Sequence, residues 1–467
     1  MSELLSIKNV FEKQRLYKYE LRDISNTDRK NKLIGLKNII HEKEQDILAA
    51  LNIDLRKSTF EASLTELYFV YAEIDFAIKN LKTWTNKHAV SANLMAFTSR
   101  NYIIYEPKGV CLIIAPWNYP FQLLIAPLVS AIAAGNCCIL KPSEYAPATS
   151  KVLKEIINSF FDPQEVYLFE GNADLVQELM TYPFDHLFFT GSTQVGKLLM
   201  KSASEHLTSV TLELGGKSPC IVLDDVDLEK AAKKIVWGKF INAGQTCIAP
   251  DYVLIAENLK TAFINELKAQ IIDLYYSDGI INEDAYCKII NEKHFNRILS
   301  LINDAKLKGA ILELPIKSNE YKLEIEPMIL TGISKEMQVM KEEIFGPVLP
   351  ILTFTDLKQA IDYVNAHVKP LALYIFGKDD KNIQEIIKNT SSGGVCINDT
   401  LVHISNPNLP FGGVNHSGMG SSHGFFGFKN FSHERAVMDQ SRIDFNALAY
   451  PPYDKKKTLL SIIKKLM

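Results

Sequence analysis

The chain has little of what marks several classes of protein. Its 467 residues contain only seven cysteines at scattered positions, which is too few and too irregular for a disulfide framework. No CxxC pair or Cys/His cluster has the spacing of a zinc site, so we predict no metal site. Basic residues number 51 and acidic residues 54. The net charge of −3 argues against nucleic acid as the main partner, because phosphate neutralisation requires a basic excess.

Long hydrophobic runs are missing as well. No uninterrupted apolar stretch reaches the roughly 20 residues that span a bilayer. The N-terminus lacks the basic and apolar regions of a signal peptide, so we expect a cytoplasmic protein with reduced thiols. The C-terminal tail, 451–467, mixes lysines with apolar residues. We expect it to dock on the protein's own fold, with weak peripheral contact with a membrane surface as the alternative.

The length and the apolar pattern predict an α/β protein with two or more domains. Residues 1–80 have helical spacing, and residues 81–108 suit a peripheral hairpin or arm. From residue 109, short continuous apolar runs alternate with helix-like segments, which predicts a parallel, doubly wound sheet. We expect its strands at 110–115, 137–140, 166–169 and 186–190, and its helices near 121–134, 148–160, 172–181 and 194–206. A second α/β stretch begins after residue 213.

One glycine-rich turn, Gly191–Leu198, approaches two nucleotide-binding motifs and completes neither. It follows the phosphate-binding G-x-x-x-x-G-K pattern, but Leu198 stands where the loop needs a hydroxyl for magnesium. It also misses the G-x-G-x-x-G fingerprint. A strand, a glycine turn and a helix N-terminus can still bind a pyrophosphate. Taken alone, a tight turn between a strand and a helix explains the segment equally well.

A thiol and a carboxylate lie in two glycine-bearing segments near the middle of the chain. Cys247 ends the segment Asn242–Cys247, and Glu213 opens the segment Glu213–Pro219. A thiolate can take an acyl group onto sulfur, and a carboxylate can activate the water that releases it. Each residue alone has an ordinary explanation, since a buried cysteine is usually a small hydrophobe and a glutamate is usually solvated.

Seven short motifs occur in a fixed order, and together they are specific. They are Pro116–Pro120, Lys141–Glu144, Phe189–Thr193, Glu213–Lys217, Gly244–Cys247, Glu343–Pro347 and Pro410–Gly413. In this order the chain resembles the NAD(P)-dependent aldehyde dehydrogenase superfamily over essentially its whole length. The short N-terminus, Asn415–Gly420 and Tyr450–Tyr453 resemble the class 3, or fatty aldehyde, branch.

The resemblance implies a fold of three parts and a tail. We expect a Rossmann-like NAD(P)-binding domain from 1–80 and 109–212, and an α/β catalytic domain from 213–405. A small β element for bridging and oligomerisation would come from 81–108 and 420–450, followed by the tail 451–467. Class 3 members are typically dimers, so we expect a homodimer.

The resemblance also assigns catalytic roles. Cys247 would attack the aldehyde carbon, and the oxyanion would be held by the Asn118 side-chain amide and the Cys247 backbone N–H. Asn118 can equally serve as a turn former. Hydride would pass to the cofactor, and Glu213 would activate the water that hydrolyses the thioester. Relatives that transfer the acyl group to coenzyme A generally lack this glutamate, so that reaction ranks lower. Two further alternatives remain. Leu198 disfavours a P-loop hydrolase, and the presence of both reactive groups disfavours a non-catalytic protein on this fold.

Six residues are implied as cofactor contacts. Lys141 and Glu144 would contact the adenosine ribose, Gly191 and Ser192 the pyrophosphate, and Glu343 and Phe345 the nicotinamide ribose and ring. Core packing is the alternative for Phe345. A carboxylate at Glu144 favours NAD by repelling a 2′-phosphate, whereas Lys141 favours NADP. We therefore expect NAD, with NADP as the alternative.

Four aromatic or imidazole side chains are implied as the walls of the substrate pocket. They are Tyr68, Tyr119, Phe411 and His423. Aromatic walls suit medium or long aliphatic aldehydes, or aromatic ones. For Tyr68, which falls on an expected helix, packing in the core is the favoured alternative.

Overall fold

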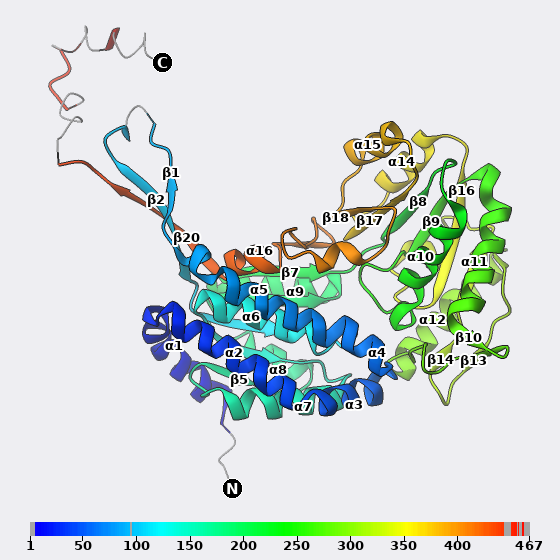
Figure 1. The fold of residues 1–467 in the computed structure, drawn as a ribbon, viewed down its shortest axis with the longest axis horizontal. Helices are drawn as coiled ribbons and strands as arrows, with labels where there is room; N and C mark the ends of the chain where they lie inside the picture. Colours follow the sequence, from blue (N-terminus) through cyan, green and yellow to red (C-terminus); the bar gives the residue numbers. More distant parts are fainter. Residues whose placement is uncertain (1–4, 94–95, 443–449, 455, 457–459, 462–467) are drawn as a thin grey trace.

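Two open sheets and a projecting three-stranded arm organise the molecule (Figure 1). The computed structural model describes residues 5–93, 96–442, 450–454, 456 and 460–461. Most of the tail 451–467 lies outside these residues, so its expected docking stays a prediction. Within the described residues, no helix combines the length and the apolar character needed to cross a membrane.

Residues 7–85 are mostly helical, in agreement with the helical spacing found over 1–80. Leu33, Leu36 and Ile40 form a fully buried stripe on the second helix, which begins with a capping box between Ser25 and Asp28. One turn is a π-helix, in which an extra residue widens the helix. The elements are α1 (Ile7–Asp23), α2 (Asn26–Glu42), α3 (Glu44–Leu55), α4 (Thr59–Ala62), the π-helix η1 (Ser63–Leu67) and α5 (Tyr68–Thr85).

The first sheet has six strands in the order β19-β7-β6-β3-β4-β5. Its strands are β3 (Val110–Ile114), β4 (Cys137–Lys141), β5 (Val166–Leu168), β6 (His186–Gly191), β7 (Ser209–Leu214) and β19 (Gly418–Met419). All neighbouring strands are parallel except β19 and β7. The helices between them are α6 (Gln122–Ala134), α7 (Pro147–Phe160), α8 (Ala173–Leu179) and α9 (Thr193–Ala203), followed by a 3₁₀ turn, η3 (Ser204–His206). The predicted doubly wound sheet is confirmed, and each predicted strand differs from the observed one by a single residue.

The second sheet has seven strands in the order β12-β15-β16-β9-β8-β17-β18, with only β12 antiparallel to its neighbour. The strands are β8 (Pro219–Val222), β9 (Tyr252–Ala256), β12 (Ile311–Leu312), β15 (Met328–Thr331), β16 (Val348–Phe354), β17 (Ala372–Phe376) and β18 (Gly394–Ile397). The helices are α10 (Leu228–Phe240), α11 (Lys260–Tyr275), α12 (Glu292–Leu307), α13 (Gln338–Lys341), α14 (Leu357–Asn365) and α15 (Asp380–Asn389). Short hairpins and turns complete it: β10 (Tyr276–Ser277) with β11 (Ile280–Ile281), β13 (Ser318–Asn319) with β14 (Glu324–Ile325), and η4 (Ile241–Gly244), η5 (Glu257–Leu259) and η6 (Val402–Ser405).

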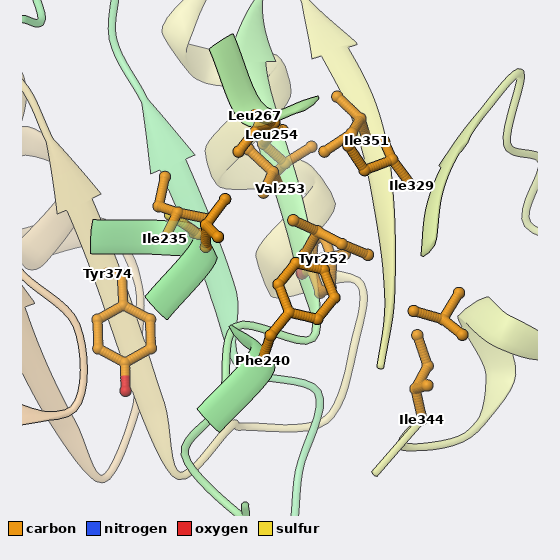
Figure 2. Packing of buried hydrophobic residues seen from close by; sticks show 14 of the residues in the cluster. Ile235, Phe240, Tyr252, Val253, Leu254, Leu267, Ile329, Ile344, Ile351 and Tyr374 are labelled. Carbon is orange, nitrogen blue, oxygen red and sulfur yellow. The ribbon is translucent and has the colours of Figure 1, made fainter. Parts of the chain in front are cut away.

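The core of this second unit is built from its strands and from α10 and α11. Figure 2 shows Val253 and Leu254 of β9 near Leu267 of α11, with Phe240 of α10 and Tyr252 below them. Tyr374 of β17 is fully buried, and its hydroxyl donates a 2.5 Å hydrogen bond to the carbonyl oxygen of Ile248. The core therefore holds the segment just after Cys247.

The arm consists of β1 (His88–Val90), β2 (Arg100–Pro107) and β20 (Ser432–Asp439), all antiparallel. Strand β2 pairs with β20 along its full length, and the arm projects away from both sheets (Figure 1). The last helix, α16 (Gly424–Asn430), does not join the arm. It packs on α5 and α6 beside the first sheet.

Candidate active site

The candidate site lies where the order of the first sheet reverses. The chain runs from β3 outward through β4 to β5, and then returns to the other side of β3 with β6. Ligands of open α/β sheets bind beyond the carboxyl ends of the strands at such a point. The loop after β3 carries Asn118, and the turn after β6 carries Gly191 and Ser192. The fold thus brings predicted catalytic and cofactor residues to one edge.

A cavity of about 320 Å³ opens beside this edge. Its wall includes both Cys247 and Glu213, the predicted nucleophile and base. Helix α6, strands β6 and β7, and the loop 401–405 supply much of the remaining wall, which is largely apolar. The second unit therefore contributes the thiol and the first unit contributes the carboxylate to a shared space.

The loop that carries Cys247 has an unusual backbone. Asn242 and Ala243 both have φ of 50°, a left-handed conformation that costs energy for residues with a Cβ. Hydrogen bonds hold Asn242 there: its N–H donates to Glu61 Oε1 at 3.0 Å, and its side chain donates to the carbonyl of Gln245 at 3.2 Å. At Gly244, with φ of 74°, a side chain would collide with the carbonyl of Gly346. This glycine lets the nucleophile loop pass against the segment that carries Glu343.

The protein groups around Cys247 favour the neutral thiol. Burial raises its pKa well above the usual range, and the negative charges of Glu343 and Glu213 raise it further. The backbone N–H groups of Cys247 and Ile248 act in the opposite direction. Because an ordinary cysteine is mostly protonated near neutral pH, Cys247 needs help to ionise, and these surroundings increase that need.

Asn118 is buried and tied to the nucleophile loop. Its side-chain amide donates to the carbonyl of Gln245 at 3.0 Å, two residues before Cys247. Its own carbonyl accepts from Asn242 Nδ2 at 2.9 Å. A side-chain amide has two N–H donors, so one remains for an oxyanion formed at the Cys247 thiol. The structure thus brings Asn118 beside the nucleophile loop.

Glu213 lies near the end of β7, on the face of the sheet that carries Phe188 and is covered by α6 and α16. Its Oε1 accepts a 3.1 Å hydrogen bond from the hydroxyl of Ser422, and its buried Oε2 has no hydrogen-bond partner among the described residues. Burial raises its pKa to about 8, although the Ser422 hydrogen bond lowers it in part. An ordinary glutamate is a weak base, and burial makes Glu213 a stronger one.

The predicted adenosine-ribose contacts lie together after β4. Lys141 is buried, and its ammonium donates to the carboxylate of Glu144. The predicted pyrophosphate contacts lie at the end of β6, where Gly191 is the last residue of the strand. Ser192 follows it and caps α9, since its hydroxyl accepts from the N–H of Val195 at 3.4 Å. A helix N-terminus for a pyrophosphate and an ammonium-carboxylate pair for a ribose fit a dinucleotide.

The predicted nicotinamide contacts come from the second unit. Glu343 lies against Gly215, where a side chain would collide with its carboxylate, and burial raises the pKa of Glu343 to about 8. The ring of Phe345 meets Trp117 edge-on at a centroid distance of 5.3 Å. Phe345 has φ of 47° and is only partly buried, so the alternative of simple core packing does not describe it well.

A buried ion pair that the sequence analysis missed fixes the Glu343 segment. The ammonium of Lys217 donates to Asp251 and to the carbonyls of Val339 (2.6 Å) and Glu342 (3.0 Å). Asp251 in turn accepts from the N–H of Ile344 at 3.0 Å. Lys217 was visible only as the end of a motif, and nothing in its sequence context identifies Asp251 as its partner.

Three of the four predicted pocket residues line the cavity, namely Tyr119, Phe411 and His423. The Tyr119 hydroxyl shares a 2.7 Å hydrogen bond with Thr246. The ring of His423 lies 5.3 Å from that of Phe411, and burial lowers the pKa of His423 to about 4. We therefore expect a neutral imidazole in the wall.

Tyr68 is a correction. Its side chain is 56% exposed and is not part of the cavity wall, so it lies neither in the pocket nor in the core. The π-helix η1 directly precedes it and rotates the following residues relative to an ordinary α-helix. Leu64, Thr65 and Phe69 face the cavity in its place, and the Phe69 ring lies 5.0 Å from that of His423.

Comparison with known proteins agrees with this geometry. The model of the aldehyde dehydrogenase family matches residues 6–437. The chain is 44% identical to 4,4'-diaponeurosporen-aldehyde dehydrogenase of Staphylococcus aureus, covering 94% of each protein. It is 43% identical to aldehyde dehydrogenase family 3 member A2 of Macaca fascicularis, covering 92% of this chain and 88% of that one. A solved structure of Staphylococcus aureus AldH in a substrate-bound state has a TM-score of 0.94 at 41% identity, covering 98% of this chain and all of that one.

The chain belongs to the aldehyde dehydrogenase family. It is an oxidoreductase that acts on aldehydes with NAD or NADP, and the resemblance to the class 3 branch is confirmed by its family 3 relatives.

Proposed function

We propose that this enzyme oxidises a medium or long aliphatic, or aromatic, aldehyde to its carboxylic acid through a thioester on Cys247. The observation that carries the proposal is the shared cavity, in which the thiol and the desolvated carboxylate of Glu213 meet an apolar wall. Residues 1–80 and 109–212 would bind the cofactor, and 213–405 would carry the thiol. The arm would come from 81–108 and 420–450, although α16 within the latter packs on the first unit.

The chemical steps follow from these groups. The Cys247 thiol gives its proton to solvent water, and its sulfur attacks the carbonyl carbon. Asn118 Nδ2 and the Cys247 N–H hold the resulting oxyanion. NAD(P), whose nicotinamide Glu343 and Phe345 would hold, would supply the acceptor for the hydride from the former carbonyl carbon, and the acyl group would remain on the Cys247 sulfur as a thioester. Glu213 then takes a proton from water as the water attacks the thioester. The carboxylic acid is released, and the Cys247 thiol is regenerated. A buried base beside the thiol favours hydrolysis over transfer to coenzyme A.

Lys141, Glu144, Gly191 and Ser192 are proposed to hold the adenosine ribose and pyrophosphate, and Glu343 and Phe345 the nicotinamide ribose and ring. Their positions around the switch point of the first sheet support this assignment. The side chains would bind and orient the dinucleotide, and the Trp117 ring would support Phe345.

A substrate panel tests the proposed aldehyde class. We expect kcat/KM to rise along a series of straight-chain aldehydes by up to about fourfold per added methylene, the value of about 0.8 kcal/mol for a buried CH₂. Rates of NADH and NADPH formation are measured for each aldehyde, and we expect the NADH rates to be higher because of Glu144. The alcohols of equal length serve as controls. A preference for short polar aldehydes, or acyl-CoA as the product when coenzyme A is added, would contradict the proposal.

We propose that the protein forms a homodimer through the arm. The three-stranded arm projects from the fold, and β20 lies at its edge with no further strand beside it in the described residues. Such an edge favours pairing with another chain. Light scattering should give twice the chain mass of 52.6 kDa. Met438→Asp on the exposed arm should weaken association, whereas Leu207→Asp, at an exposed position directly after η3 and outside the arm, should not. A monomer at all concentrations would refute the dimer.

A cytoplasmic location is also proposed. All seven cysteines are free, and reduced thiols suit that compartment. Weak membrane contact through the C-terminal tail is the alternative; the described residues Tyr450, Tyr453 and Leu460 are exposed. Fractionation of cells into soluble and membrane pools would distinguish the two locations.

A further inference from the structure

A fully buried ion pair lies beneath the loop that carries Asn118. Lys57 and Glu66 both have no exposed surface, and the Lys57 ammonium lies 2.5 Å from Glu66 Oε1. Lys57 comes from the turn between α3 and α4, and Glu66 comes from the π-helix η1. Neither side chain lines the cavity, and neither takes part in the proposed steps of the reaction.

The pair holds the Asn118 loop at both ends. The Lys57 ammonium donates a 3.0 Å hydrogen bond to the carbonyl of Asn118 and lies 3.9 Å from the centre of the Tyr119 ring. The second oxygen of Glu66 accepts from the N–H groups of Phe121 and Gln122, both at 3.0 Å, at the start of α6. Residues 118–122 are thus attached to one ion pair through a carbonyl and two N–H groups.

The same pair reaches the nucleophile loop indirectly. The carbonyl of Asn118 accepts from both Lys57 and Asn242, and the Asn118 side chain donates to Gln245. A displaced Asn118 would therefore lose its alignment with the loop that ends at Cys247. A misplacement of about 1 Å in a catalytic group can cost about 10²-fold in rate.

Stability alone is a weak reason for such a pair. Removing two charges from water is costly, and well-packed apolar residues often serve equally well in a core. What apolar residues cannot supply is a charged donor to one carbonyl and a charged acceptor for two N–H groups across the same loop.

We propose that Lys57 and Glu66 are positioning residues, which act through the backbone of residues 118–122 to aim the Asn118 amide at the oxyanion. The inference rests on the proposed role of Asn118 and adds the pair that sets its geometry. It predicts that the pair affects the formation of the oxyanion much more than the binding of the aldehyde.

The test is a double-mutant cycle on the full-length enzyme with cofactor. Replacing both partners, Lys57→Met with Glu66→Gln, removes both charges without leaving one buried and unpaired. We expect the single-turnover rate of NADH formation to fall about 10²-fold, with KM changed less than about threefold. In the Asn118→Ala background the same replacement should change the rate less than about threefold, because both changes remove the same function, the alignment of the Asn118 amide with the oxyanion. The single variants Lys57→Arg and Glu66→Gln should retain intermediate rates.

Arg29 supplies a matched control. It is 7% exposed, and its guanidinium donates to the carbonyls of Ala133 and Ala134 at the far end of α6. Arg29→Met should lower the melting temperature, as we also expect for a change at Lys57, but leave the single-turnover rate nearly unchanged.

Several outcomes would overturn the inference. If the paired replacement leaves the rate unchanged while Asn118→Ala lowers it, or if its effect persists in full without Asn118, the pair does not position that residue. If the paired variant does not fold, unchanged rates in Lys57→Arg and Glu66→Gln would contradict the inference equally. A normal rate in Asn118→Ala alone would instead contradict the proposed function.

Discussion

Replacing Cys247 with serine is expected to abolish NADH formation, with a loss of at least about 10³-fold in kcat. Serine has nearly the shape of cysteine, so the left-handed turn at Asn242 and Ala243 can keep its hydrogen bonds. The hydroxyl, however, ionises far less readily than a thiol. The surroundings already raise the pKa of the Cys247 thiol through burial and two carboxylates, and the same forces act on a serine alkoxide.

The measurement is the absorbance of NADH, both in the first turnover and at steady state. Cys396→Ala is the matched control, because Cys396 is also a free cysteine of the second unit but lies on β18 outside the cavity wall. The control should keep its turnover and its reaction with a thiol reagent at Cys247. A Cys247→Ser enzyme that still forms NADH at the normal rate would refute the covalent mechanism.

The sequence was sufficient for four strands of the first sheet, β3 to β6, because these are largely buried on both faces. Runs such as Val110–Ile114 and Cys137–Leu140 are apolar without interruption, and polar residues mark their ends. Strand β7 was harder to predict from the sequence, since it is exposed at its start and ends in the motif that contains Glu213. Strand β19 has two residues and pairs with β7 across about 200 positions of sequence, so no local pattern could reveal it.

The residues of the site likewise divide into those that the sequence identifies and those that it does not. Cys247, Glu213 and Asn118 lie in short motifs that sequence comparison can detect. Tyr68 was assigned to the pocket from the resemblance alone, and the structure instead leaves it 56% exposed directly after the π-helix η1.

Lys57 and Glu66 could not be found from the sequence for a different reason. Isolated charged residues in a helical stretch usually lie in water, and only the fold shows that these two are buried against each other. The desolvation that raises the pKa of Glu213 is likewise a property of the helices packed above it. Motifs therefore identify the reacting groups, whereas burial and partners, which set their chemistry, depend on contacts between distant segments.

Glu213→Gln is expected to form about one NADH per active site and then nearly stop. Glutamine preserves the shape and can still contact Ser422, so Cys247, Asn118 and the cofactor site remain able to complete the hydride step. It cannot accept a proton from water. Loss of a general base costs about 10²–10⁴-fold, so we expect steady-state turnover to fall by that factor. Stopped-flow detection of NADH separates the two phases, and mass spectrometry should find the acyl group on Cys247.

The pH dependence of hydrolysis follows from the same residue. Burial raises the pKa of Glu213 to about 8, so the carboxylate that accepts the proton becomes the main form only above that pH. Where hydrolysis limits turnover, kcat should rise as the pH increases through about 8 and then level off. The Ser422 hydroxyl lowers this pKa by donating to the carboxylate, so Ser422→Ala should move the midpoint to higher pH.

The pH profile and the burst must agree for Glu213 to be the base. Glutamine does not titrate, so the residual turnover of Glu213→Gln should lose the rise near pH 8, whereas a base located elsewhere would keep it. Glu343 provides the decisive comparison, because burial raises its pKa to about 8 as well and its charge also acts on Cys247. If Glu343 binds the nicotinamide ribose, Glu343→Gln should slow the burst itself and leave no accumulated thioester. A burst followed by arrest in Glu343→Gln, with normal turnover in Glu213→Gln, would reverse the two assignments.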